Sequence, residues 1–421
     1  MTRDATRTEG TATGRVDYLV GGVRIRLDGA STTPGPTAHI KGFTGGLGAL
    51  GLHAQVVLAS DLTIALPVAG LAEGSAQGKS SAQVLIADLY RLAVAAAALI
   101  NVARGSRRTP PPTLIYERVA VLQCMNWGHR WRRRVPVVVE SNGIMSRETA
   151  EDRGALRLRR VAGWMERRVY RRADLVVAVS ESLREEVVRF AGIPEARTIV
   201  VRNAIPDGVL ARPVPNSSSH PDAPIRIGFV GTVVDWQQLD LLIEAVAQAP
   251  RAGKYLIDVI GDGPALPGVR ATTDRLGLSS VVRFHGRLDH AAVERLASDW
   301  SYGYAGHKAT SSTTMYHSPL KVWEYAGAGA GLITTSSEDA RYLASAGVPV
   351  HFFNDLDSLV GALDHAVDSI SSVYDYRTGA LHAVRRDNDW RARASEVLKR
   401  LDLPRPVDIG HSGGDSPPRW R

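Results

Sequence analysis

The feature that most constrains the fold is an alternation of short apolar runs with longer amphipathic segments, which stops once and then starts again. Residues 23–27 and 54–58 are the first runs with strand character. Residues 175–179 are uncharged and apolar throughout, as in strands buried on both faces of a parallel sheet. Two such arrays predict an α/β protein of two doubly wound domains. Its ligand site should lie at the carboxyl ends of the strands, in the cleft between the domains.

The interruption and the two chain ends set the expected domain boundaries. Residues 206–224 are rich in Pro, Asn, Ser and Asp, which is typical of a linker. We predict a disordered N-terminus (residues 1–14), an N-terminal domain (15–205), this linker (206–224) and a C-terminal domain (225–388). A last helix (389–403) and a disordered polar tail (404–421) follow.

The chain is basic, with 51 Lys and Arg against 43 Asp and Glu, and the excess is concentrated. Residues 130–134 and 153–172 are rich in arginine, and apolar spacings of 3, 4 and 4 in the second segment predict an amphipathic helix. A solvated helix face explains this charge most simply, while an anionic partner such as nucleic acid, a membrane or an acidic acceptor is the alternative. Aromatic residues are not interleaved as single-strand binding requires, so we expect no nucleic-acid partner and leave peripheral membrane contact open.

Three further features bound the type of protein. The single cysteine, Cys124, excludes an internal disulfide and a cysteine-rich metal site. The first fourteen residues lack the apolar core of a secretory signal. The uncharged run at residues 92–102 is too short to span a bilayer and is expected to form a buried helix. These features predict a soluble, cytoplasmic protein without a transmembrane segment. They do not indicate its oligomeric state.

Residues 317–325 (HSPLKVWEY) carry the most informative local pattern. Ser318 suits an N-cap and Pro319 the first turn, so a helix is expected to start at Pro319, with Lys321 and Glu324 on one face. A lysine in the first turn opposes the helix dipole unless an anion is bound there. The residues therefore allow two interpretations. One is a nucleotide diphosphate at the helix start, with Glu324 on the ribose, and the other is an ordinary surface Lys and Glu.

Seven segments occur in an order and spacing typical of one enzyme family. Four lie in the second array, at residues 225–231 (IRIGFVG), 259–264 (VIGDGP), 282–286 (VRFHG) and 318–326 (SPLKVWEYA), and three in the first, at residues 114–118 (LIYER), 173–182 (ADLVVAVSES) and 200–203 (VVRN). On these segments the chain resembles family-four retaining glycosyltransferases, which have the GT-B fold of two facing Rossmann-like domains. The resemblance covers residues 22–400, and its donor motif is that of the subgroup with Ser-Pro-Leu-Lys-x-x-Glu-Tyr.

The resemblance implies transfer of a sugar from a nucleoside-diphosphate sugar to a hydroxyl- or amine-bearing acceptor, with retention of anomeric configuration. It implies no cofactor and no divalent metal, a donor in the C-terminal domain, an acceptor in the N-terminal domain and a last helix packed back across the cleft. A small-molecule or glycan acceptor in bacterial natural-product or cell-surface glycan synthesis fits this pattern. Two Asp-x-Asp pairs, at residues 355–357 and 387–389, suit helix caps better than a metal site.

Motif position and strand ends then assign residues to the two substrates. The catalytic assignments are Lys321, Glu324 and His317, the last standing where the family often has a glutamate. The donor-binding assignments are Gly231, Thr232, Arg287, Leu288, Ser318, Pro319, Leu320, Lys321 and Glu324. The acceptor-binding assignments are Gly35, His39, Glu117, Arg118, Glu140 and Asn142.

One departure from the family pattern keeps other functions open. Thr232 and Gln237 stand where the family usually offers basic residues to the diphosphate, which would weaken leaving-group stabilisation. The alternative is therefore a pseudo-glycosyltransferase or a non-catalytic homologue with an altered donor. A nicotinamide-dependent oxidoreductase is disfavoured because no complete G-x-G-x-x-G with a following acid occurs at a strand–helix turn. A nucleic-acid-binding protein would rest on charge alone.

Overall fold

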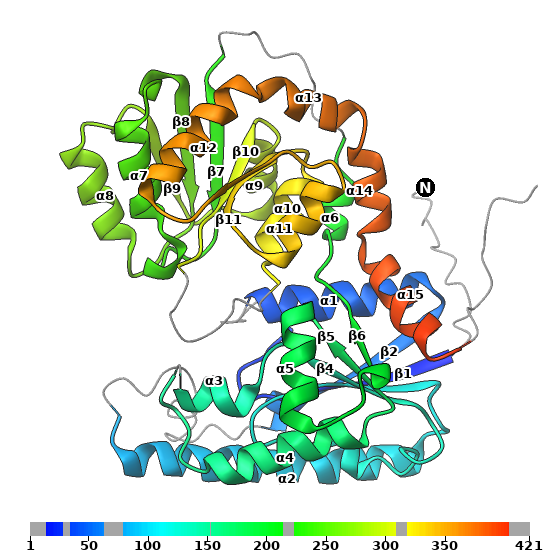
Figure 1. Cartoon of the computed structure of the whole chain (residues 1–421). Coiled ribbons are helices and arrows are strands. Elements are labelled where there is room, and N and C mark those ends of the chain that lie inside the picture. The colour runs from blue at the N-terminus through cyan, green and yellow to red at the C-terminus, as the bar shows by residue number, and fades with distance from the viewer. Residues whose placement is uncertain are drawn as a thin grey trace, which may run out of the picture.

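The computed structural model describes residues 14–27, 34–62, 79–151, 153–213, 223–308 and 318–403. They form two domains, each built on a six-stranded parallel sheet flanked by helices (Figure 1). This confirms the predicted pair of doubly wound domains. Residues 1–13 and 404–421, both expected to be disordered, and residues 214–222 of the expected linker lie outside the described residues.

The N-terminal sheet has the order β2-β1-β3-β4-β5-β6 and the C-terminal sheet the order β12-β11-β10-β7-β8-β9. The strands of the first sheet are β1 (Gly14–Val20), β2 (Leu52–Leu58), β3 (Leu114–Arg118), β4 (Val137–Ser141), β5 (Leu175–Ala178) and β6 (Thr198–Val200). Those of the second are β7 (Ile225–Val230), β8 (Tyr255–Ile260), β9 (Val282–Gly286), β10 (Tyr302–Ala305), β11 (Gly331–Thr335) and β12 (Val350–Phe353).

Helices connect the strands and cover both faces of each sheet. In the N-terminal domain they are α1 (Pro34–Ala49), α2 (Ser81–Arg108), α3 (Met145–Glu151), α4 (Arg159–Arg172) and α5 (Glu181–Ala191). After the short α6 (Asp207–Leu210) come α7 (Leu239–Gln248), α8 (Leu266–Arg275), α9 (His290–Ala297), α10 (Leu320–Gly327) and α11 (Glu338–Ser345). The chain ends with α12 (Leu356–Asp368), α13 (Ile370–Thr378), α14 (Leu381–Asp387) and α15 (Trp390–Arg400).

The first strand is not where the sequence pattern placed it. Residues 23–27 lie in a loop, and β1 begins at Gly14. Arg15 and Asp17 break the apolar run of this strand in the sequence, but in the fold both charges are paired. Asp17 lies 2.7 Å from Arg15 Nε and 2.6 Å from the buried His129 Nε2. A hydrophobicity pattern does not show such pairing, so it treats Arg15 and Asp17 as exposed polar residues.

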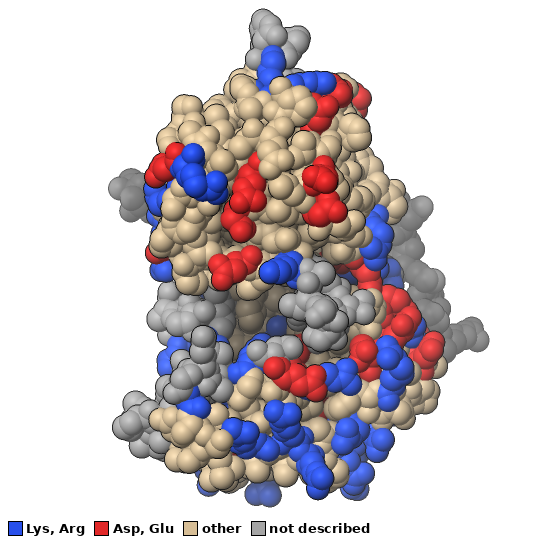
Figure 2. Space-filling view, turned by 60° about the vertical axis from the view of Figure 1, so that its left-hand side comes forward, with Lys and Arg blue, Asp and Glu red and all other residues tan. Residues whose placement is uncertain are grey.

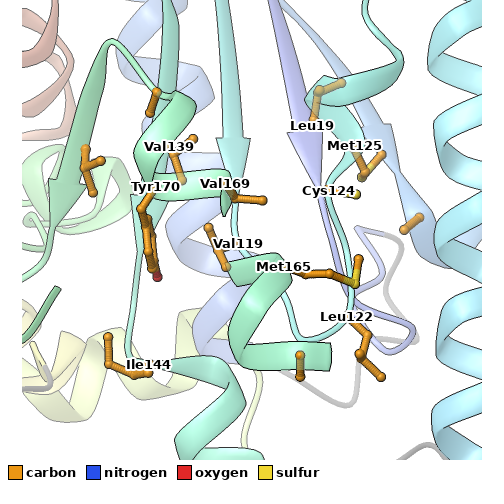
Figure 3. Close-up of a cluster of buried hydrophobic side chains, with 14 of the residues drawn as sticks. Leu19, Val119, Leu122, Cys124, Met125, Val139, Ile144, Met165, Val169 and Tyr170 are labelled. Carbon is orange, nitrogen blue, oxygen red and sulfur yellow. The ribbon is translucent and has the colours of Figure 1, made fainter. Parts of the chain in front are cut away.

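The N-terminal core lies on both faces of its sheet, because every residue of β4 and β5 is buried. On one face Leu19 and Val139 pack with Met165 and Val169 of α4 (Figure 3). On the other face a second cluster contains Phe43 of α1 and Trp390 of α15, so the last helix belongs to the N-terminal core.

Close contact between α1 and α15 requires small residues (Figure 1). A Cβ atom at Gly42 would lie 2.1 Å from Trp390 Nε1, and one at Gly46 would lie 2.2 Å from the Trp390 carbonyl oxygen. The junction before α15 is also tied to the first domain, because Ile205 N donates to Asn388 O at 2.8 Å. The chain therefore passes from the C-terminal domain back onto the N-terminal one.

The run at residues 92–102 is only half buried, and this corrects the expectation of a buried helix. It is the middle of α2, which has 28 residues and starts with a capping box between Ser80 and Gln83. By length and composition α2 is the one described helix that could cross a membrane, and only 39% of its most apolar window is buried. Asp88 and Arg91 interrupted the apolar pattern and concealed this length, but they form a buried ion pair with each other.

Candidate functional site

The carboxyl ends of β7 and β8 converge beside the recess between the two domains that Figure 2 shows. Gly231 and Gly261 follow these strands with φ of +140° and +128°, a region that favours glycine. A Cβ at Gly261 would lie 1.9 Å from the Gly231 carbonyl oxygen, so the two turns touch backbone to backbone. Such exposed strand ends are where open α/β sheets bind ligands.

Lys321, in the first turn of α10, extends over the Gly231 turn. A Cβ at Gly231 would lie 3.0 Å from Lys321 Nζ. The ammonium donates to Gln237 Oε1 at 2.7 Å and lies 3.8 Å from the centre of the Phe229 ring. Burial lowers the pKa of Lys321 to about 7, although Glu324 acts in the opposite direction. An anion beside Lys321 would stabilise its charged form and so offset the effect of burial on its pKa.

The start of α10 differs by one residue from the prediction, and Ser318 is not its N-cap. Pro319 occupies the N-cap position, and its side chain makes no capping hydrogen bond. The Ser318 hydroxyl instead donates to Asp339, and it accepts from Asn203 N at 3.1 Å. Ser318 therefore joins the domains, and the first amides of α10 have no partner within the helix.

Asp339, which the sequence analysis missed, anchors this junction. It is 1% exposed, accepts from Trp323 Nε1 at 2.9 Å, and lies 3.4 Å from Arg202 Nε. Burial raises the pKa of Asp339 to about 6, while the bonds from Ser318 and Trp323 oppose the rise. An acidic residue in the first turn of a helix is common, so its sequence position gave no signal.

Four of the predicted acceptor residues meet in one buried cluster. Glu140, at the end of β4, lies 3.1 Å from His39 Nε2 and also accepts from Arg118 and Asn142. Tyr116 OH donates to its second oxygen at 2.9 Å. Burial alone would raise the pKa of Glu140, but His39 and Arg118 outweigh it and hold that pKa well below its usual range. Glu140 is therefore a fixed anion.

His39 connects this cluster to the C-terminal domain. Its Nδ1 lies 2.7 Å from Asn203 Oδ1, while the amide nitrogen of Asn203 donates to the Ser318 carbonyl. Gly35, at the start of α1, approaches the same junction, since a Cβ there would lie 3.9 Å from Leu320 Cδ1. The predicted donor and acceptor residues are therefore linked through Asn203.

The remaining predicted residues lie apart from this cluster. Glu117 points into the domain, where Met125 N and Asn126 N donate to it at 2.7 and 2.9 Å. Thr232 is exposed after β7, and the Arg287 side chain is 83% exposed, with Nε 3.8 Å from Asp262. Leu288 is 36% exposed, and His317 lies outside the described residues. Glu117 is thus fully engaged in holding a turn, a partnership that only the fold reveals.

Two further features concern what this end of the sheet can bind. Trp236 is 46% exposed, and its ring centre lies 4.5 Å from that of His307, which follows β10. This pair adds an aromatic surface next to Gln237. The described residues contain no group of three or more His, Cys, Asp or Glu side chains that could hold a metal ion.

Comparisons with known proteins agree with this architecture. The family model described as glycosyltransferase family 4 matches residues 38–208, and no curated protein matches the chain. The apo lipopolysaccharide outer core galactosyltransferase WaaB is 13% identical, with a TM-score of 0.60 over 92% of this chain and 99% of that one. Anabaena HepE in complex with UDP-glucose is 14% identical, with a TM-score of 0.58 over 92% and 99%.

A third structure extends the comparison to another enzyme. Sucrose-phosphate synthase from Thermosynechococcus elongatus is 14% identical, with a TM-score of 0.62 over 92% of this chain and 98% of that one. Two parallel six-stranded α/β sheets in this arrangement are the GT-B fold, as predicted.

Proposed function

We propose that this chain, in which residues 38–208 match glycosyltransferase family 4 and the whole has the GT-B fold, is a retaining glycosyltransferase that uses a nucleoside-diphosphate sugar. The observation that carries the proposal is Lys321. Its ammonium is partly buried at the carboxyl ends of the donor-domain strands, beside a glycine turn and at the start of a helix. Each of these features favours an anion at the same point.

The donor diphosphate would lie between the Gly231 turn and the first turn of α10. There Lys321 and the free amides of the helix would stabilise the negative charge that develops as the sugar leaves. A positive charge supplied by the protein makes a divalent metal unnecessary for this step. Glu324, one turn further along α10, would accept hydrogen bonds from the ribose hydroxyls.

Gln237 can serve this site although it is neutral. Its side-chain oxygen already accepts from Lys321 at 2.7 Å, so its amide nitrogen remains the donor that a phosphate oxygen could use. The pair would then present the ammonium and the amide together. Trp236 and His307 lie beside this pair and would form an apolar wall for the donor.

The acceptor would bind near the cluster around Glu140. The His39 ring lies between two acceptor oxygens, with Nδ1 2.7 Å from Asn203 Oδ1 and Nε2 3.1 Å from Glu140 Oε1. Because Glu140 is a fixed anion, we assign it the role of orienting His39 and Arg118. The leaving phosphate, rather than a protein carboxylate, would then take the acceptor's proton. We propose a small-molecule or glycan hydroxyl or amine as acceptor.

The proposal is tested by thermal unfolding of the purified chain with UDP, GDP, dTDP, ADP and CDP. One nucleotide at a hundred times its Kd should stabilise the protein by about 2.7 kcal/mol. Glu324→Ala and Lys321→Met should abolish this response, whereas Lys399→Met, an exposed lysine on α15, should retain it.

Activity separates the enzyme from its alternative. If a nucleotide binds and its sugar is transferred, the proposal stands. Failure of all five nucleotides to stabilise the wild-type chain would refute it. That result would favour the non-catalytic homologue, in which Gln237 serves only to hold Lys321.

A further inference from the structure

The outward face of α2 exposes apolar side chains that nothing in the described structure covers. Leu85, Ile86, Leu89 and Ile100 are 40%, 43%, 54% and 47% exposed. They recur with Ala82, Ala93 and Ala96 at intervals of three and four, along one side of the helix. Single exposed hydrophobic residues are ordinary, but a continuous stripe of this length marks an interaction site.

The opposite face of α2 packs into the domain, so in this fold the helix lies along the domain surface. Val84, Val94 and Ala98 are buried in the core. Asp88 and Arg91 pair at 2.7 Å, and Asp88 also accepts from Arg157 N and Leu158 N, just before α4. A helix buried on one side and apolar on the other is suited to lie in the plane of an interface.

Helix α4 extends this surface with a tryptophan among arginines. Val161 and Trp164 are 41% and 53% exposed. Trp164 contacts Trp127 edge to face, with ring centres 6.3 Å apart, and Trp127 lies in the turn that packs on α2. Asp88 of α2 accepts from Leu158 N, just before α4, and Figure 1 draws both helices along the same edge of the N-terminal domain. Exposed tryptophan is enriched where proteins meet the interface of a membrane.

The charge on this surface has one sign. The exposed arginines of α2, of the loop after Trp127, and of α4 with the residues before it are Arg104, Arg107, Arg108, Arg130, Arg133, Arg134, Arg157, Arg159, Arg160, Arg168, Arg171 and Arg172. In residues 81–108, 125–134 and 157–172 the acidic residues are Asp88 and Glu166, and both are buried. Lys and Arg side chains gather over the N-terminal domain in Figure 2.

We propose that this surface, formed by α2, α4 and residues 127–134 and called the α2–α4 face, docks the protein on an anionic phospholipid bilayer. The apolar stripe and Trp164 would enter the boundary between head groups and acyl chains, while the arginines contact the anionic head groups. A nucleic acid would satisfy the arginines but would leave the uncharged stripe, which extends from Ala82 to Ile100, in water. A bilayer with anionic head groups offers both an apolar layer for the stripe and negative charge for the arginines.

The experiment is co-sedimentation of the full chain with vesicles of phosphatidylcholine, with and without about one third phosphatidylglycerol. We expect binding only to the anionic vesicles. Arg160→Glu with Arg168→Glu should weaken it about thirty-fold, and Leu85→Gln with Leu89→Gln at least about tenfold. The control variants lie on the C-terminal domain: Arg283→Glu with Arg295→Glu carries the same charge change, and Phe352→Gln removes an exposed apolar side chain.

Weakening in both α2–α4 variants, with both controls binding as the wild type does, supports the proposal. Absence of binding to anionic vesicles by the wild type overturns it. Sensitivity to the arginine changes alone, together with equal binding to duplex DNA, also overturns it and identifies a general polyanion surface. Far-ultraviolet circular dichroism of each variant confirms that these exposed changes leave the fold intact.

Discussion

Replacing Lys321 with methionine should make the free protein more stable while removing its response to nucleotide. Burial lowers the pKa of Lys321 from 10.5 to about 7, so the folded protein binds fewer protons than the unfolded chain between these pH values. Stability of the wild type therefore rises with pH across that window, and the cost of the buried ammonium is fully present below pH 7. From this shift the cost is at most about 5 kcal/mol.

The gain in the free energy of unfolding of Lys321→Met is smaller than this limit. Methionine leaves Gln237 Oε1 without its 2.7 Å donor, which costs about 1–3 kcal/mol. We therefore expect Lys321→Met to exceed the wild type by about 2–4 kcal/mol at pH 6, and the difference to shrink towards pH 10. A substitution that stabilises a protein while it abolishes ligand binding is the mark of a residue kept for function.

Urea denaturation at pH 6 and at pH 9.5, with and without the nucleotide that stabilises the wild type, measures both effects. Lys399→Met, on an exposed face of α15, should change neither quantity. A Lys321→Met variant less stable than the wild type at pH 6 would refute this account of Lys321. A difference between the two proteins that is the same at both pH values would also refute it, since burial of the charge would then not be its cause.

Binding of the nucleotide that stabilises the chain should weaken about 30-fold from pH 6 to pH 8.5, because Lys321 deprotonates near pH 7. Titration calorimetry of the wild type at the two pH values measures this change. Glu140→Gln should lose about 3–5 kcal/mol of stability at pH 7, measured by urea denaturation. Because its pKa lies below 4.5 in the folded chain, the loss should diminish at pH 3.5, and a pH-independent loss would contradict the ion-pair account. Gly46→Ala should destabilise the protein by at least about 2 kcal/mol through a clash with Trp390, whereas Gly48→Ala, which meets nothing within 4 Å, should stabilise it by about 0.5–1 kcal/mol in thermal denaturation.

The sequence was most informative where local pattern and fold agree. The apolar runs at residues 175–179 and 225–231 correspond to β5 and β7, and the helix expected at Pro319 begins one residue later. These elements have strong periodicity or buried strands, which local sequence encodes directly.

Partners distant in sequence account for what the pattern missed. Ser318 is a reasonable N-cap by type, but Asn203 and Asp339 take its hydroxyl, and they lie 115 and 21 residues away. Glu117 looked like a cleft carboxylate, but the turn at Met125 folds back on it. In α2 the buried Asp88 and Arg91 resembled an interruption of the apolar pattern because their pairing is visible only in three dimensions.

The same long-range partners explain how the two halves of the candidate site can act together. Glu140 contacts His39, His39 contacts Asn203, and Asn203 bonds both the backbone and the hydroxyl of Ser318, immediately before α10. On the other side of the junction, Glu338 accepts from Glu181 N and Ser182 N at 2.7 and 2.8 Å. A donor that binds at the start of α10 would therefore lie next to Ser318, which is already hydrogen-bonded through Asn203 to the predicted acceptor cluster. A shift of α10 would break the bonds of Asn203 to Ser318 unless His39 moved with it, so we expect Asn203 to couple the proposed donor and acceptor sites.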